Sequence, residues 1–253
     1  MFTPVFWSQA IWLLIFTLEA VFVVFQCLHK FKHCPLVERT VGWYFFLTNC
    51  CQTAWIISYC FDTISVATLF MAANIVALAI LNINIYNCDW LDSPASRREA
   101  MTSRDFGRMD MVNEFLTFRL PFQIHLGWAI FMFLVNVNEF FYLREIPFQQ
   151  YIALGSCIML WIVGIALLFV PTYPNFIAPL VFSWAAMGLW VELHNPDEVI
   201  ESYTKREIDI SEIDVQRMTN CAIATCIEHL VLPMMRFLFH FAENYSLMER
   251  EVN

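Results

Sequence analysis

The chain has 253 residues, of which 59% are hydrophobic and only 15% are charged. Soluble domains average roughly 45–50% apolar and about 25% charged residues, so this composition argues against a soluble domain and is typical of a membrane protein. The formal net charge of −9 argues against a nucleic-acid partner, because binding to phosphates needs a basic surface.

Six apolar segments are long enough to cross a hydrocarbon core about 30 Å thick, which takes roughly 20 helical residues. In chain order they are Trp7–Leu28, Val41–Phe61, Ser65–Tyr86, Leu120–Tyr142, Tyr151–Val170 and Phe176–Leu193. A seventh segment, Asn220–Phe241, carries Glu228, His229 and Arg236, so it either spans in contact with protein or lies in the interface. The sequence therefore predicts an all-α, polytopic membrane helical bundle with six or seven transmembrane helices, as a single membrane domain over residues 1–253.

The links between these segments differ in length. Residues 62–64 and 171–175 form links so short that their flanking helices must be antiparallel neighbours. Residues 87–119 mix arginines with apolar side chains, which predicts either an interfacial amphipathic helix or a solvated loop. We expect residues 194–219 to form an acidic extramembrane linker and residues 220–253 to form the seventh helix and a tail.

Basic residues gather in the first and third links. They are Lys30, Lys32, Arg39, Arg97, Arg98, Arg104, Arg108 and Arg119. Loops rich in lysine and arginine stay on the cytoplasmic side, or on the matrix or stromal side of an organelle. The N-terminus is therefore expected on the opposite side, in a multi-pass protein for which mitochondrial and plastid membranes are candidates.

Polar residues inside the predicted helices are the first candidates for function, because a polar group in lipid costs free energy unless it contacts protein or a cavity. In the first helix, Trp12, Glu19 and Gln26 are seven residues apart and form one stripe, which should face the bundle. Glu19 is either a ligand- or proton-binding carboxylate or a hydrogen-bonded side chain that ties helices together.

The fourth predicted helix carries a second polar face. His125, Met132 and Asn136 project within about 20° of one direction, with Trp128 beside them. An imidazole, an indole and an amide on one face could line a pocket for a flat apolar ligand. A polar seam between packed helices explains the same residues equally well.

Amide side chains in the second and third predicted helices are weaker signals. Asn49, Gln52 and Trp55 repeat at three-residue steps, and Asn74 and Asn82 add further amides. Hydrogen bonds between transmembrane helices average well under ~1 kcal/mol, so such amides often serve packing alone.

Three of these segments resemble the tryptophan-rich sensory protein and translocator protein (TspO/MBR) family over roughly residues 7–140. The W-x-x-L-Y of the family is similar to Trp12–Phe16, and its N-x-x-W is similar to Gln52–Trp55, with glutamine in place of asparagine. Its last-helix motif is similar to the stretch containing Trp128 and Asn136 in the same register. Pro121 departs from that motif, since it precedes Trp128 by seven residues and not by four.

The resemblance implies a helical bundle that binds porphyrin- or sterol-like molecules. Its matched residues Trp12, Trp55, Trp128 and Asn136 would then belong to the pocket, and the polar faces add Glu19 and His125 to the candidate ligand-binding residues. No catalytic or metal residue is assigned. The candidate ligands are a porphyrin, a sterol or a bound lipid.

Three classes of function follow. The first is a non-enzymatic protein that binds or carries a hydrophobic small molecule in its bundle. The alternative is an accessory structural subunit of a larger organellar membrane complex, with other membrane subunits or further copies of itself as partners. The third is an intramembrane enzyme that uses a buried carboxyl group, Glu19 or Glu192, as a proton donor.

Overall fold

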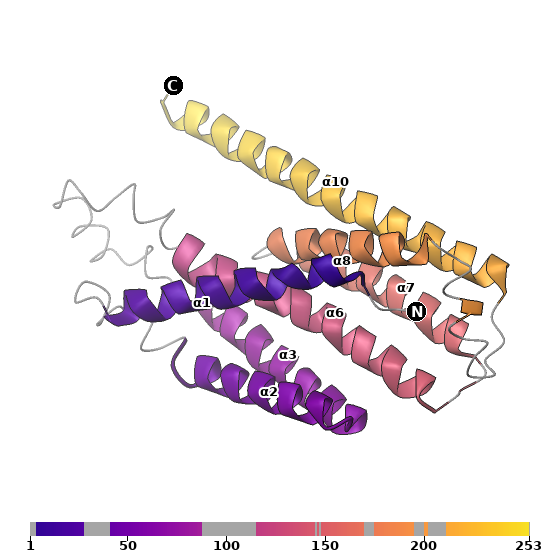
Figure 1. The fold of residues 1–253 in the computed structure, drawn as a ribbon. Coiled ribbons are helices and arrows are strands. Elements are labelled where there is room, and N and C mark those ends of the chain that lie inside the picture. The colour runs from indigo at the N-terminus through magenta and orange to yellow at the C-terminus, as the bar shows by residue number, and fades with distance from the viewer. Residues whose placement is uncertain are drawn as a thin grey trace. The chain divides into compact units, whose positions relative to one another are not determined.

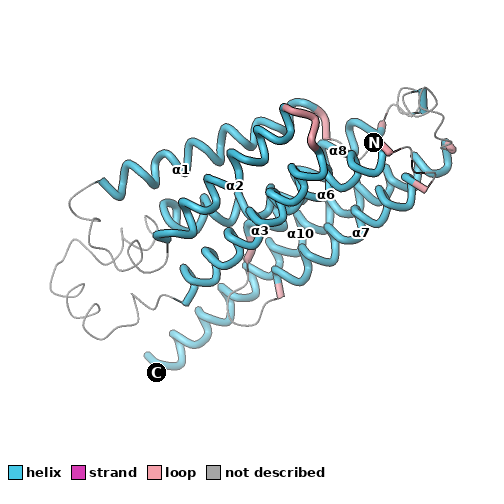
Figure 2. Tube along the Cα trace, turned by 90° about the horizontal axis from the view of Figure 1, so that it is seen from below, coloured by secondary structure: helices cyan, strands magenta, loops and turns pink. Residues whose placement is uncertain are grey.

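The computed structural model describes most of the chain, and within the described part the secondary structure is helical, without a strand (Figures 1 and 2). The described residues are 4–27, 41–87, 115–144, 146, 148–169, 175–194, 200–201 and 211–252. The chain forms two units, which are residues 10–136 (unit 2) and residues 1–9 with 137–253 (unit 1).

The described helices match the predicted segments one for one. Unit 2 contains α1 (Ile11–Cys27), α2 (Gly42–Cys60), α3 (Ile64–Asn87), the π-helical turn η3 (Phe115–Arg119) and the first part of α6 (Leu120–Tyr142). Unit 1 contains the end of α6, α7 (Gln149–Leu168), α8 (Ile177–Leu193), α10 (Glu212–Val252) and most of the short 3-10 helix η1 (Phe6–Ala10). The prediction of an all-α membrane bundle is confirmed.

Five stretches of the described helices are long and apolar enough to cross a membrane. They are Phe6–Gln26, Ile64–Asn87, Phe115–Tyr142, Gln149–Leu168 and Glu212–Phe239. Helix α8 is apolar but has 17 residues, about 26 Å of helix at 1.5 Å per residue. Helix α2 has 19 residues but is more polar, since Thr48, Asn49, Gln52 and Thr53 interrupt its apolar sequence.

In unit 2, α2 and α3 form the antiparallel pair that the short link predicts, and they lie side by side in both views (Figures 1 and 2). The turn between them is tied by Thr63, whose hydroxyl donates to the Ser58 carbonyl at 2.8 Å. Asp62 has a φ of 53°, in the left-handed region that ends many helices and that aspartate tolerates better than most residues.

Most of the basic residues that set the predicted orientation lie outside the described residues, as does most of the predicted acidic linker. Arg119 is the described exception, and its guanidinium lies 5.3 Å from the centre of the Tyr86 ring. The orientation, the interfacial segment over 87–119 and the choice of organelle therefore stay predictions.

In unit 1, α8 and α10 lie alongside each other (Figure 1). The Ser183 hydroxyl on α8 donates to the Cys226 carbonyl on α10 at 2.8 Å. Helix α10 begins at Glu212, eight residues before the predicted Asn220, because Ser211 caps it: the Asp214 amide donates to the Ser211 hydroxyl at 3.2 Å. The pattern of apolar residues missed this start since the first two turns are largely polar.

Helix α7 packs against α10 at Gly164, where the ring of His229 occupies the space that a side chain would fill. His229 is 2% exposed, and its Nδ1 lies 2.9 Å from the Thr225 carbonyl oxygen, which holds the ring in place. A glycine lets two helices approach closely, as is common in membrane bundles.

We therefore expect Gly164→Ala to destabilise the protein by about 1–3 kcal/mol, the usual cost of overpacking, because the new methyl group would overlap the His229 ring. Thermal unfolding in detergent would measure it. Gly155→Ala on the same helix is the matched control, since a methyl group there meets nothing within 4 Å. Equal melting temperatures for the two variants would contradict the close packing at Gly164.

Candidate functional site

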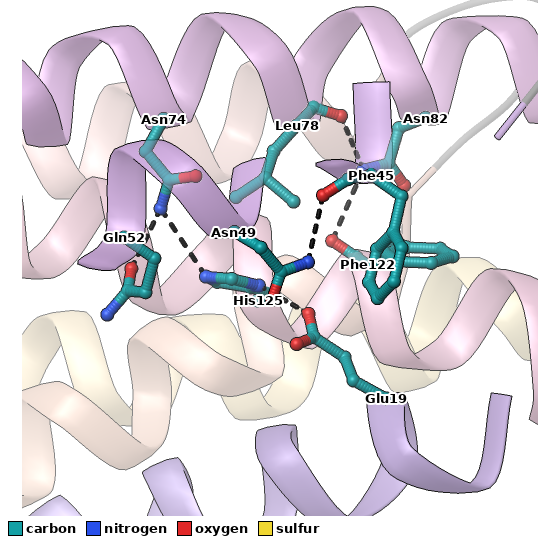
Figure 3. Close-up of polar contacts among 9 residues, drawn as sticks. All are labelled: Glu19, Phe45, Asn49, Gln52, Asn74, Leu78, Asn82, Phe122 and His125. Atoms are coloured by element: carbon teal, nitrogen blue, oxygen red, sulfur yellow. Dashed lines mark hydrogen bonds and ion pairs between the residues drawn. The ribbon is translucent and has the colours of Figure 1, made fainter. Parts of the chain in front are cut away.

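The centre of unit 2 holds a buried acid–base pair. Glu19 on α1 and His125 on α6 are 5% and 1% exposed, and Glu19 Oε1 lies 2.6 Å from His125 Nδ1 (Figure 3). The prediction that Glu19 faces protein and not lipid is therefore confirmed. Contact with a base lowers the cost of burying a carboxyl group, which would be high for an unpaired charge.

Two amides extend this pair toward α3 and α2. Asn74 Nδ2 lies 3.4 Å from His125 Nε2 and donates to Gln52 Oε1 at 2.9 Å (Figure 3). Asn74 is fully buried and Gln52 is 4% exposed. Four helices of unit 2 thus each contribute one polar side chain to a continuous row.

Three tryptophans stand next to the row. The Trp12 ring lies 5.6 Å from the ring of Trp55 in a stacked arrangement, and 6.3 Å from the ring of Trp128 in an edge-to-face arrangement. The Trp12 ring also lies 6.0 Å, edge-to-face, from the imidazole of His125. Such separations and angles are those at which aromatic rings attract each other.

Several polar atoms of this aromatic and polar cluster have no hydrogen-bond partner although they are buried. They are Trp55 Nε1, Trp128 Nε1, Gln52 Nε2 and Asn74 Oδ1. A buried polar atom without a partner costs about 1–3 kcal/mol, so native proteins satisfy nearly all of them. The cluster thus contains three donors and one acceptor without partners.

Two core regions hold the cluster in position. Toward the other end of α3, Asn82 Nδ2 donates to the carbonyls of Leu78 and Phe122, at 2.8 and 3.2 Å (Figure 3). One turn of α1 beyond Glu19, the buried Phe22 ring lies 5.1 Å from Phe122, edge-to-face. These contacts fix the rotation of α1, α3 and α6 about their axes, and hence where Glu19, Asn74 and His125 project.

Five of the six predicted ligand-binding residues come together in this cluster: Trp12, Glu19, Trp55, His125 and Trp128. The sixth, Asn136, is fully buried with both amide atoms unpartnered, but it lies eight residues beyond Trp128, ~12 Å along the helix axis. Its part in a common site stays a prediction.

Gln52 and Asn74 were not predicted as site residues. Their sequence signal is an amide in the middle of an apolar helix, which is ambiguous by itself. Asn49, also noted on α2, bonds within its own helix: it is exposed, and its side chain donates to the Phe45 carbonyl at 2.8 Å.

A family model described as TSPO-like protein matches residues 1–205 of the chain. This range includes all of unit 2 and extends through α7 and α8. Comparison with curated protein sequences gave no match, and comparison with solved structures gave none.

Proposed function

The chain belongs to the TSPO-like protein family and is a multi-pass membrane protein, and on that premise we propose that unit 2 binds a hydrophobic small molecule against Trp12, Trp55 and Trp128. The observation that supports this most is the set of buried polar atoms without partners, two of which belong to the indoles of Trp55 and Trp128. A ligand that bonded to them would remove their cost, and that gain would add to its affinity.

The chemistry of the cluster favours a particular kind of ligand. Indole rings supply flat apolar surface, which stacks on planar or fused-ring molecules. The N–H groups of Trp55 and Trp128 and the amide of Gln52 are donors, so the ligand should carry acceptor oxygens. A porphyrin with its carboxylates, a sterol with its hydroxyl group and a lipid with its ester carbonyls all meet this description.

Within this proposal the Glu19–His125 pair holds the ring of Trp12 in position. Its 2.6 Å contact holds the imidazole against Trp12 and connects α1 to α6. The pair thus keeps the Trp12 ring in contact with the rings of Trp55 and Trp128. A positioning role of this kind needs no chemical step, which agrees with a protein that binds or carries its ligand unchanged.

The test is a binding titration with protoporphyrin and with a fluorescent sterol, on the full chain in lipid nanodiscs. Trp128→Ala should weaken binding about tenfold or more, which corresponds to about 1.4 kcal/mol or more. Trp128→Phe should lose less, because it keeps ring area and lacks only the N–H group. Helical content by circular dichroism would show that each variant is folded.

Trp43→Ala is the matched control. Trp43 is 80% exposed, whereas Trp128 is fully buried, so its removal should leave affinity unchanged. Equal affinity of Trp128→Ala and Trp43→Ala, or no saturable binding by the wild-type protein, would refute the proposal. The accessory-subunit alternative would then be tested by mass spectrometry of the gently purified complex.

A further inference from the structure

The row of polar side chains in unit 2, called the polar relay below, consists of Glu19, His125, Asn74 and Gln52. Asn74 makes both of its contacts in this relay with the same atom, its amide nitrogen. Asn74 Nδ2 lies 2.9 Å from Gln52 Oε1 and 3.4 Å from His125 Nε2 (Figure 3). The two hydrogens of this amide nitrogen therefore point to two acceptors.

This arrangement limits where the Glu19–His125 pair can hold a proton. Since Asn74 Nδ2 is a donor, His125 Nε2 facing it must present its lone pair and carry no hydrogen. One proton then remains for the contact between His125 Nδ1 and Glu19 Oε1, which are 2.6 Å apart. With the other carboxyl oxygen of Glu19 unprotonated, the pair then holds one proton and carries one net negative charge.

Each of the two amides in the relay uses one of its polar atoms in a hydrogen bond and leaves the other without a partner. Asn74 Oδ1 and Gln52 Nε2 are both buried without a hydrogen bond. If both amides turned by half a rotation, Asn74 Oδ1 would stand where Nδ2 stands now, between the same two neighbours. Gln52 Nε2 would then donate to it, and so would a protonated His125 Nε2, because a carbonyl oxygen accepts two hydrogen bonds.

We infer that the Glu19–His125 pair is a proton-binding site, and that binding of a second proton reverses the amides of Asn74 and Gln52. The proton comes from water and forms a bond to His125 Nε2. The two hydrogen bonds of Asn74 Nδ2 break, and two hydrogen bonds to Asn74 Oδ1 replace them. The pair then carries no net charge.

The surroundings leave this pair as the titrating unit. Glu19 is the titratable group that faces His125 from α1. Asn74 from α3, Gln52 from α2 and the Trp12 ring are neutral. The amides can therefore respond to the proton without taking up a charge themselves, and they transmit its presence from α1 and α6 to α2.

Nitrogen NMR of the ligand-free full chain in nanodiscs would test this, with ¹⁵N in histidine, asparagine and glutamine side chains. The titration would run from about pH 4 to about pH 9, which covers the ordinary ranges of carboxyl and imidazole groups. On acidification we expect the His125 Nε2 signal to change from unprotonated to protonated. The side-chain signals of Asn74 and Gln52 should change with the same midpoint.

Asn74→Leu separates the relay from a direct effect, because leucine has nearly the shape of asparagine and cannot hydrogen-bond. His125 should still titrate in this variant, while the Gln52 signal should no longer follow it. Asn49→Leu is the matched control, since Asn49 bonds within α2, and the coupling should persist there.

Three results would overturn the inference. They are a His125 Nε2 that does not gain a proton over this range, a Gln52 signal that is constant while His125 titrates, and a Gln52 signal that follows His125 equally in Asn74→Leu. The second can be read in the wild-type protein, so the test stands even if Asn74→Leu fails to fold. No ligand takes part, and failure of the proposed binding function would leave the outcome unchanged.

Discussion

Replacing His125 by leucine is expected to destabilise the protein by about 3 kcal/mol, since leaving a buried polar group without its hydrogen-bond partner costs about 1–3 kcal/mol, and more for a charged group. The Glu19 carboxyl would be left 5% exposed without the imidazole that lies 2.6 Å from it. Leucine is close to histidine in size, so the loss would come mainly from the unpartnered carboxyl group and not from a cavity. Denaturant titration in mixed micelles would measure the free energy of unfolding.

Two further variants isolate the cause. Glu19→Gln should cost only about 1 kcal/mol, because its amide still hydrogen-bonds to the imidazole. The double variant Glu19→Leu with His125→Leu should recover much of the loss, since replacing both members of a buried pair by apolar groups is often neutral. Additive losses in the double variant would show that the two side chains are not coupled.

Phe22→Ala should also cause a large loss, toward the lower end of the about 3–5 kcal/mol found for buried phenylalanines. Phe22 is fully buried, and its ring lies 5.2, 5.5 and 5.1 Å from the rings of Phe45, Phe118 and Phe122, all edge-to-face. Lipid is as apolar as the protein interior, so the loss would consist of packing contacts and the cavity left behind.

Phe16→Ala on the same helix is the control for this variant. Phe16 is 44% exposed, so its ring is partly in contact with lipid. Alanine there would replace this lipid contact by another and should change the stability little. Thermal unfolding followed by circular dichroism would compare the two variants. A melting temperature for Phe22→Ala as high as that for Phe16→Ala would mean that the phenylalanine cluster does not support α1.

The membrane class and the helices could be predicted because both are local properties. A run of about 20 apolar residues predicts its own helix, with bounds good to a few residues. Seven such runs match seven described helices, and the main error is in α10 (Glu212–Val252), which continues past the predicted end at Phe241 and starts before the predicted Asn220. At the start, Ser211 and the polar first turns replace the apolar signal. The spacing of His125 and Trp128 likewise predicts that both lie on one region of α6.

The partners of those residues could not be predicted in the same way. Helical periodicity says which side chains share a face, but not which other helix meets that face or at what depth. Glu19 and His125 are 106 residues apart, and nothing local joins them. Gln52 and Asn74 have the pattern of ordinary packing amides, and only the pairing of α2 with α3 places them in the relay.

By itself, the sequence determined that this chain is an all-α membrane protein with its polar groups concentrated on few helix faces. Hydrophobic length and helical period carry that information, and both act within one segment. Only the tertiary structure decided that Glu19 pairs with His125, that Trp12 contacts both Trp55 and Trp128, and that Asn74 connects two further helices. Those pairings depend on how each helix is rotated and how deeply it is placed, which the packing of all the helices in unit 2 sets together.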